Sequence, residues 1–213
     1  MDIWIESFVM QPPSISESKR LLQRFGLDAS SVQGVPNSIS LPKLKYGYRT
    51  TKMNWPELFD IIEKEKDLAK LSRHETQQRE YEIFRYYLKR QYQSVVDFIL
   101  CSKFGHDRIR NDEDDDESVG LWKAHPPLSK VSNVTKVLVP NDFPYYTDDD
   151  IVHYVLWKTK LDITKEDIED AQKELRTRLQ LKEILHWVNP PHLKSLPEID
   201  HVHFLCLLKE PIG

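Results

Sequence analysis

The sequence predicts an α+β fold, with a helical N-terminal half and a small β-sheet crossed by one helix in the C-terminal half. Two observations carry this prediction. Apolar residues recur at steps of three and four between residues 55 and 104, which is the period of an amphipathic helix. Between residues 134 and 208, short runs rich in β-branched and aromatic residues alternate at a period of two instead, and one capped helix precedes the last run.

The composition is that of an ordinary globular protein. Of 213 residues, 39% are hydrophobic and 30% are charged, so we expect a single domain over residues 1–213. A net charge of −4 gives no electrostatic case for nucleic acid, and no apolar run approaches the roughly 20 residues that cross a bilayer. The N-terminal residues lack the basic and apolar regions of a signal peptide. We therefore expect a cytoplasmic protein, with the nucleus left open, and no nucleic-acid or membrane partner.

The two cysteines, Cys101 and Cys206, lie in apolar segments without the spacing of a metal site or a redox pair. We expect both to be buried free thiols in a reducing compartment.

The first part of the chain, residues 1–52, is predicted as a largely irregular arm with one short helix. Ser14 or Ser16 offers an N-cap for that helix, and Gly26 is placed to end it. No periodicity follows from residue 27 to residue 52, where serine, proline, glycine and asparagine dominate.

Two amphipathic helices are predicted next. Asn54, Pro56 and Glu57 form a start signal for a helix over 55–70. The segment from Ser72 to Glu75 reads as a second capping box, and the apolar stripe behind it predicts one long helix over about 73–104. Tyrosines on this helix are interpreted as core residues, because no basic patch accompanies them as it would in a surface that stacks on bases.

A run of acidic residues over 111–118 follows the long helix. It lacks the alternating ligands and the central glycine of an EF-hand loop, so calcium binding is not indicated. We interpret it as a solvated, disordered loop.

The C-terminal half alternates strands with one helix. Strands are predicted over 134–139, 151–157 and 201–208, and Thr164 with Asp167 is predicted to cap a helix that runs to about Leu185. The last strand is apolar on both faces toward its end, which is typical of a central strand covered on both sides.

Histidines on these strands are the main candidates for a functional site. A strand has a side-chain period of two, so His201 and His203 point to one face. If strands 151–157 and 201–208 are neighbours, His153 joins them. Three imidazoles with the carboxylate of Asp200 would suit a divalent transition metal such as zinc, iron(II) or manganese. Without metal, the same groups would serve as acid and base.

Other candidate ligand-binding residues lie on or beside these strands, and the polar ones are in the flanking loops, where functional groups are commonly found. The rings of Tyr145, Trp157 and Trp187 would supply flat walls for a sugar or a base. The polar groups of this set are Asp142, Asn189 and His192.

Four segments, in this order, resemble the fungal N-acetylglucosamine-induced protein family. They are NDFPY from Asn141, HYVLW from His153, WVNP from Trp187 and HVH from His201. The resemblance covers the chain from the long predicted helix to the C-terminus. It implies a small cytoplasmic protein of the amino-sugar response that binds a sugar nucleotide or a similar polar ligand. The family brings no established reaction, so no catalytic residue is carried over.

Three functions remain open at this point. The first is ligand binding in a pocket lined by histidine and tryptophan. The second is a metal-dependent hydrolase or another enzyme that uses His153, His201 and His203. The third is a non-catalytic interaction or regulatory protein in which the histidines are structural. Histidine-triad nucleotide hydrolases are set aside, because Leu205 occupies the place of their third histidine. The sequence also lacks a phosphate-binding glycine-rich loop and the GxSxG and HExxH motifs.

Overall fold

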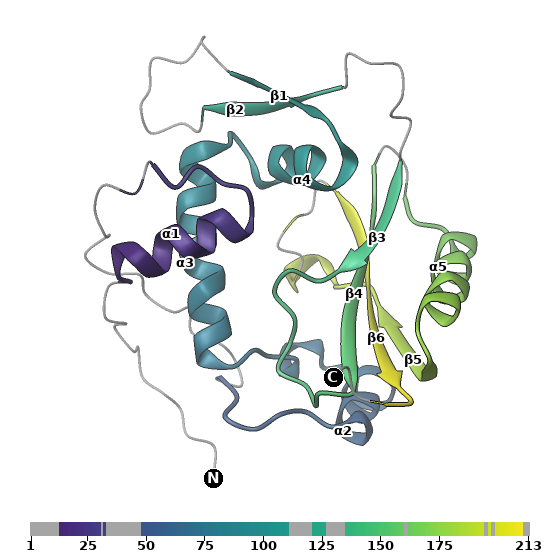
Figure 1. The fold of residues 1–213 in the computed structure, drawn as a ribbon. Coiled ribbons are helices and arrows are strands. Elements are labelled where there is room, and N and C mark those ends of the chain that lie inside the picture. The colour runs from purple at the N-terminus through teal and green to yellow at the C-terminus, as the bar shows by residue number, and fades with distance from the viewer. Residues whose placement is uncertain are drawn as a thin grey trace. The chain divides into compact units, whose positions relative to one another are not determined.

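The computed structural model describes residues 13–30, 32, 48–110, 121–126, 135–159, 162–193, 196 and 199–210. Within these residues, five α-helices and two antiparallel sheets confirm the α+β prediction (Figure 1). Helices lie mainly in the N-terminal half of the chain and strands in the C-terminal half. The chain forms two compact units. Unit 1 contains residues 1–43 and 76–133, and unit 2 contains residues 44–75 and 134–213. The expectation of a single domain stays a prediction.

Helix α1 (Ile15–Arg24) in unit 1 confirms the predicted short helix. A capping box starts it, because Ser14 Oγ accepts from the backbone N–H of Glu17 and the Glu17 carboxylate accepts from the N–H of Ser14. The Phe25 ring at its end lies 4.7 Å from that of Phe84. Other parts of the predicted irregular arm, residues 1–12, 31 and 33–47, lie outside the described residues, as does the acidic loop at 111–118.

The predicted long helix over 73–104 is wrong in its extent, because two helices occupy this region. These are α3 (Glu75–Gln91) and α4 (Val95–Phe104). Ser94 starts the second helix by accepting the N–H of Asp97 at 3.0 Å. Just before it, the N–H of Gln93 donates to the carbonyl of Trp122 in a strand. The apolar period continues across the break because both helices bury a face, so the period alone conceals the second N-cap.

Unit 1 contains a small sheet that was not predicted. Strands β1 (Asp107–Arg110) and β2 (Trp122–His125) pair antiparallel as a two-stranded ribbon. Arg108 lies over the Trp122 ring, 4.4 Å from its centroid.

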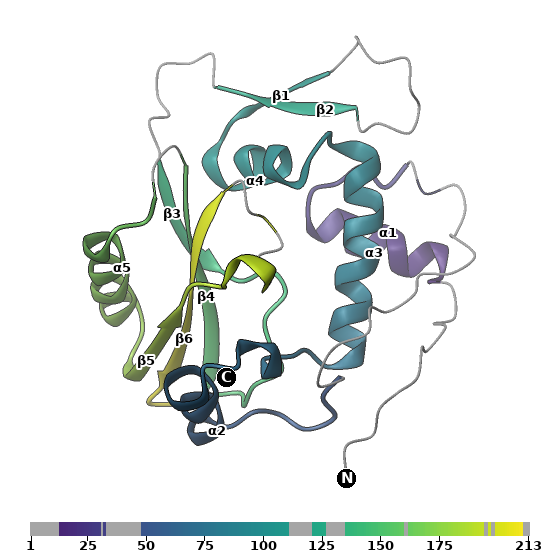
Figure 2. The same cartoon turned by 180° about the vertical axis from the view of Figure 1, so that it is seen from behind.

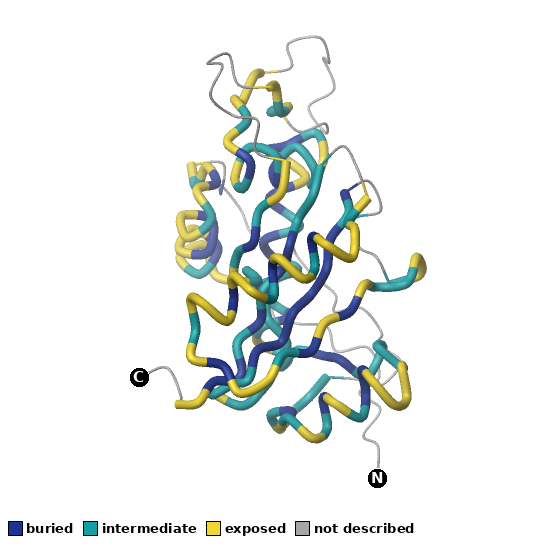
Figure 3. The backbone as a smooth tube through the Cα atoms, turned by 90° about the vertical axis from the view of Figure 1, so that its right-hand side faces the viewer, coloured by how far each residue is buried: buried dark blue, intermediate teal, exposed yellow. Residues whose placement is uncertain are grey.

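Unit 2 is built on a four-stranded antiparallel sheet with the order β3-β4-β6-β5. Its strands are β3 (Lys136–Pro140), β4 (Ile151–Lys158), β5 (Leu181–Trp187) and β6 (Asp200–Leu208). Strand β6 pairs with β4 on one edge and with β5 on the other, and most of its residues are buried (Figure 3). The prediction of a central strand covered on both sides is confirmed.

The helix expected to run to about Leu185 is shorter than predicted. Helix α5 spans Lys165–Arg178, and the chain then turns into β5. The missed strand has buried residues at Leu181, Leu185 and Trp187, a spacing that also fits a helical stripe. The segment forms a strand because its backbone pairs with β6, and the sequence does not reveal this pairing.

The two faces of this sheet have different covers (Figures 1 and 2). On one face, Ala171 and Leu175 of α5 pack against Val202, Phe204 and Cys206 of β6. On the other face, Leu205 and its neighbours pack against residues of a helical segment after Asn54. Alternate residues of β6 therefore serve two separate cores, as a period of two requires.

The helical segment after Asn54 differs from the regular helix predicted over 55–70. It consists of α2 (Trp55–Phe59), a π-helical turn η1 (Asp60–Glu65) and a 3₁₀ turn η2 (Leu68–Lys70). Lys66 ends η1 in the left-handed region with φ +56°, which stops the helix. Leu58, Ile61 and Ile62 are nevertheless buried on the side that the stripe predicted.

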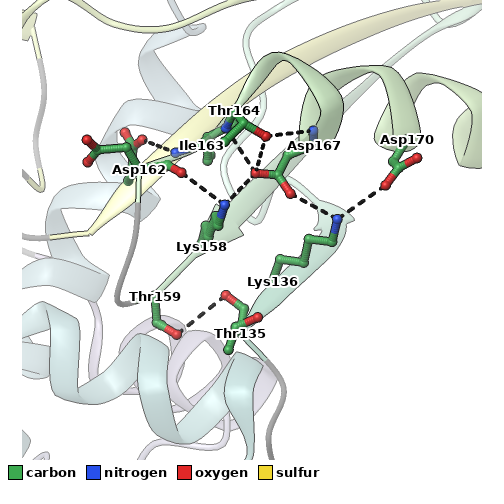
Figure 4. Close-up of polar contacts among 10 residues, drawn as sticks. Thr135, Lys136, Lys158, Thr159, Asp162, Ile163, Thr164, Asp167 and Asp170 are labelled. Atoms are coloured by element: carbon green, nitrogen blue, oxygen red, sulfur yellow. Dashed lines mark hydrogen bonds and ion pairs between the residues drawn. The ribbon is translucent and has the colours of Figure 1, made fainter.

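Asp167 ties the start of α5 to the neighbouring strands of the sheet (Figure 4). Its carboxylate accepts hydrogen bonds from Lys158 Nζ at 2.5 Å and from Lys136 Nζ at 2.9 Å. It also completes the predicted capping box with Thr164. The Lys158 bond, followed by that of the Thr164 N–H, lowers the pKa of the Asp167 carboxyl below its ordinary value. This is a charge-assisted network with side chains about nine-tenths buried at its centre.

We predict that Asp167→Asn lowers the free energy of unfolding of the protein by about 3 kcal/mol, because it leaves Lys158 buried without its counter-ion. Urea unfolding followed by tryptophan fluorescence measures the loss. Since the folded pKa is depressed, the stabilisation is present above about pH 3.8 and is lost as the pH falls further. The matched control is Asp170→Asn, whose side chain is 64% exposed and which is expected to cost less than about 0.5 kcal/mol. Equal losses for the two variants would contradict this account.

Candidate functional site

The structure brings His153 and His203 together on the face of the sheet opposite α5. His153 on β4 lies opposite Leu205 of β6, so His203 is its diagonal neighbour two residues away. Nε2 of His153 lies 3.0 Å from Nδ1 of His203. Only 5% of His153 and 9% of His203 is exposed. The two strands are thus neighbours with their histidine faces aligned, which is the condition under which His153 joins His201 and His203.

Asn189 holds the His203 end of this pair. The indole Nε1–H of Trp187 can only donate, and it donates to Asn189 Oδ1 at 3.0 Å. The amide orientation is thereby fixed, so that Asn189 Nδ2 points at Nε2 of His203, 3.2 Å away. Nε2 of His203 is therefore an acceptor.

Asn141 holds the His153 end in a similar way. The backbone N–H of Phe143 donates to Asn141 Oδ1 at 3.0 Å, which turns the Asn141 amide nitrogen toward His153. This nitrogen lies 3.2 Å from Nε2 and 3.3 Å from Nδ1 of the imidazole. The pair of histidines is thus enclosed between two side-chain amides that both present donors.

His201 belongs to the same cluster but has different partners. Its Nδ1 lies 3.0 Å from the carbonyl oxygen of Ile199, and it is only 2% exposed. Its ring meets that of His203 edge-on, with centroids 5.3 Å apart. His201 is therefore a neighbour of the hydrogen-bonded pair through ring packing.

Each predicted aromatic wall stacks on one of the histidines. Tyr145 stacks on His153 with centroids 5.2 Å apart, and Trp187 stacks on His203 at 5.1 Å and an interplanar angle of 11°. Trp157 lies 4.8 Å from His201. One face of each ring is thus occupied by an imidazole. Tyr145 and Trp157 remain partly exposed, whereas Trp187 is buried.

Arg73 places a positive charge beside the pair. Its Nε donates to the carbonyl of Phe143 at 2.9 Å, and its guanidinium lies 5.4 Å from the centroid of the Tyr145 ring. Neither Arg73 nor Asn141 was predicted as a site residue. Arg73 lies in the SRHE segment that was interpreted as a helix cap, and Asn141 begins the NDFPY segment, where its side chain could have been considered.

Burial keeps both central histidines neutral. Desolvation, followed by the charge of Arg73, lowers the pKa of His153 to about 3. Desolvation also lowers the pKa of His203 well below its ordinary value, and His153, His201 and Arg73 add to the effect. At neutral pH these imidazoles act as hydrogen-bonding groups and not as cations.

Three other predicted site residues lie at the start of β6 and in segments outside the strands. Asp200 binds the N–H of Ile163 through Oδ2 at 2.8 Å, toward the loop before α5. His192 is exposed on the 3₁₀ turn η3 (Pro191–Leu193), and Asp142 is partly exposed in the loop after β3. Within the described residues, no three side chains of histidine, cysteine, aspartate or glutamate are placed to hold a metal ion. The metal prediction with His153, His201, His203 and Asp200 therefore has no three-ligand arrangement to support it.

The cysteines are free, as predicted, but differ in burial. Cys206 is fully buried in the α5 core, which raises the pKa of its thiol to about 12. Cys101 is only partly buried, so the expectation of burial is wrong for this residue. In the described part of the chain, none of the helices combines the length and apolar character that a membrane crossing needs.

A comparison with known protein families assigns this chain to one of them. The model of DUF3605, a family of proteins of unknown function, matches residues 54–207. The chain belongs to the DUF3605 family. The DUF3605 region includes Arg73, Asn141, both central histidines and Asn189. The comparison with curated proteins finds no match. Among solved structures, the crystal structure of HTC1 is 22% identical and has a TM-score of 0.43, over 76% of this chain and 86% of HTC1.

We predict that His153 and His203 remain neutral from pH 8 to pH 5, because charging them would place a cation in a dry site. Imidazole ¹⁵N chemical shifts that stay constant over this range would confirm it. Since the folded pKa of His153 lies below its ordinary value of about 6.5, the unfolded chain binds the proton first as the pH falls. Its contribution to stability is complete above pH 6.5, and about 2 kcal/mol of it is lost by pH 5.

A change in the imidazole ¹⁵N shifts of His153 or His203 between pH 8 and pH 5 would contradict the neutral pair.

Proposed function

We propose that this DUF3605 protein binds a small polar ligand of the sugar-nucleotide type, and that its buried histidines shape the site without serving as acid–base catalysts. The observation that carries this proposal is the neutral row of Asn141, His153, His203 and Asn189, each held by directional hydrogen bonds. Groups fixed in this way recognise a ligand by donor and acceptor pattern. A base with a pKa of about 3 takes up a proton only weakly at neutral pH.

The partly exposed side chains beside this row suit the parts of such a ligand. The planar guanidinium of Arg73 has the geometry that pairs with phosphate oxygens. Tyr145 and Trp157 are partly exposed rings on which a sugar or a base would stack. Arg73 supplies a cation beside the row, Tyr145 stacks on His153 within it, and Trp157 packs on the adjacent His201. A cation and two aromatic rings are the ingredients of a nucleotide-sugar site.

The ligand class comes from the resemblance of the four segments to the fungal N-acetylglucosamine-induced proteins. On that basis we propose a cytoplasmic protein of the amino-sugar response, with a sugar nucleotide as its small-molecule partner and with neither nucleic acid nor membrane as a partner. UDP-N-acetylglucosamine is the ligand to test first.

The alternatives receive unequal support. A metal-dependent hydrolase through His153, His201 and His203 finds no set of three ligands among the described residues. A non-catalytic interaction protein is favoured by a specific observation, since each of these histidines is less than 10% exposed and has a polar partner inside the fold. In that case the row would stabilise the sheet, and no small ligand would bind.

We expect UDP-N-acetylglucosamine to bind the full chain in isothermal titration calorimetry, and Arg73→Gln to weaken binding about tenfold by removing the charged partner of a phosphate. The control is Arg178→Gln on α5, whose side chain is 52% exposed and pairs with Glu174. This control should bind like the original chain. No heat of binding at millimolar ligand would overturn the proposal in favour of the interaction protein. Equal weakening by both substitutions would refute the assignment of the phosphate contact to Arg73.

A further inference from the structure

The hydrogen-bond row contains one ring N–H more than its acceptors can satisfy. Two neutral imidazoles carry two N–H groups. One of them fits between the rings, where His153 Nε2 and His203 Nδ1 are 3.0 Å apart. The other must lie on an outer nitrogen, and each outer nitrogen faces an amide donor, Asn141 or Asn189. Placing both N–H groups between the rings would instead oppose two donors there.

The unsatisfied N–H belongs to Nδ1 of His153. Asn189 approaches His203 through Nε2 alone, so that nitrogen must accept, and the His203 proton lies on Nδ1 and points to His153. His153 Nε2 then accepts, and its proton lies on Nδ1. Asn141 Nδ2 lies across the imidazole edge, 3.2 Å from Nε2 and 3.3 Å from Nδ1. The single lone pair of Nε2 is taken by His203, so Nδ1–H faces an amide donor and has no acceptor.

An N–H group without an acceptor is costly at this depth. His153 is 95% buried, and within the described part of the chain its ring nitrogens contact only Asn141 and His203. An unmade hydrogen bond at a buried donor costs about 1–3 kcal/mol. An acceptor atom supplied from outside the chain would recover this energy.

The groups around this N–H are also donors. Phe143 anchors two of them, since its N–H binds Asn141 Oδ1 and its carbonyl accepts Arg73 Nε. The amide hydrogens of Asn141 and the positive charge of Arg73 are thus held next to the imidazole by one backbone unit. A site surrounded by donors and one cation favours an oxygen that carries negative charge.

We propose that His153 Nδ1–H, with Asn141 and Arg73, forms a binding site for one oxygen of an anionic group, with phosphate as the probe. This deepens the proposed function and rests on it for the identity of the whole ligand. The donors of His153, Asn141 and Arg73 would bind the phosphate of a sugar nucleotide. Tyr145 and Trp157 would contact the sugar and the base of the same ligand.

The first test uses the imidazole ¹⁵N spectrum of the full chain, titrated with inorganic phosphate up to about 10 mM. We expect a protonated Nδ1 at His153 whose resonance moves on addition of phosphate. A protonated Nδ1 that phosphate leaves unmoved would mean that a buried water satisfies it, and it would overturn the anion site. An unprotonated Nδ1 would overturn the proton count itself.

Two substitutions at one position separate binding from structure. Asparagine places its amide near the position of Nδ1, and glutamine places its amide near that of Nε2. We expect His153→Asn to bind phosphate within about threefold of the original chain and His153→Gln to bind more than about tenfold more weakly. Equal affinities would refute the assignment to Nδ1. If neither variant folds, the spectrum of the unsubstituted chain decides by itself.

The outcome is separable from that of the proposed function. Phosphate that shifts His153 while UDP-N-acetylglucosamine fails to bind would support the anion site and refute the sugar nucleotide. Binding of UDP-N-acetylglucosamine that depends on Arg73 but leaves the His153 resonances unchanged would do the reverse.

Discussion

The pairing of β6 with a strand on each edge is the constraint on which unit 2 depends. It buries a run of side chains from His201 to Cys206, and the period of two sends them alternately into two cores. The face toward α5 receives purely apolar residues from this run. The opposite face receives Leu205 together with two imidazoles, whose polar atoms must then be satisfied inside the protein. The row of Asn141, His153, His203 and Asn189 supplies hydrogen-bond partners for these buried nitrogen atoms.

The hydrogen bonds of the row have a fixed direction, because each amide is oriented by an N–H group that can only donate. A tryptophan indole fixes the amide of Asn189, and a backbone N–H fixes that of Asn141. With both ends fixed, the tautomers of the histidines between them are determined by counting protons. Stacked aromatic rings exclude water from the flat faces of the imidazoles, so the same packing that orients them keeps them neutral. A neutral, oriented imidazole is suited to recognition more than to proton transfer.

Several features of the site were accessible from the sequence because they depend on local period. His201 and His203 on one face, the faces of β4 and the cap at Thr164 all follow from spacing along the chain. Arg73 was not accessible, because its segment resembles a helix cap and only the fold brings it to Phe143. The interruption between α3 and α4 was concealed by an apolar stripe that both helices share. Strand β5 was mistaken for the end of a helix, since Leu181 and Leu185 fit either period.

By itself, the sequence determined the fold class, the central position of the last strand and the alignment of its two histidines, since these rest on patterns of neighbouring residues. The tertiary structure decided which groups complete the site. It paired His153 with His203 and not with Asp200, and it enclosed the pair between two amides from separate loops. The physical reason is that a hydrogen bond between residues 50 apart in the chain depends on strand register and loop path. Strand register and loop path cannot be deduced from the local sequence pattern around His153 or around His203.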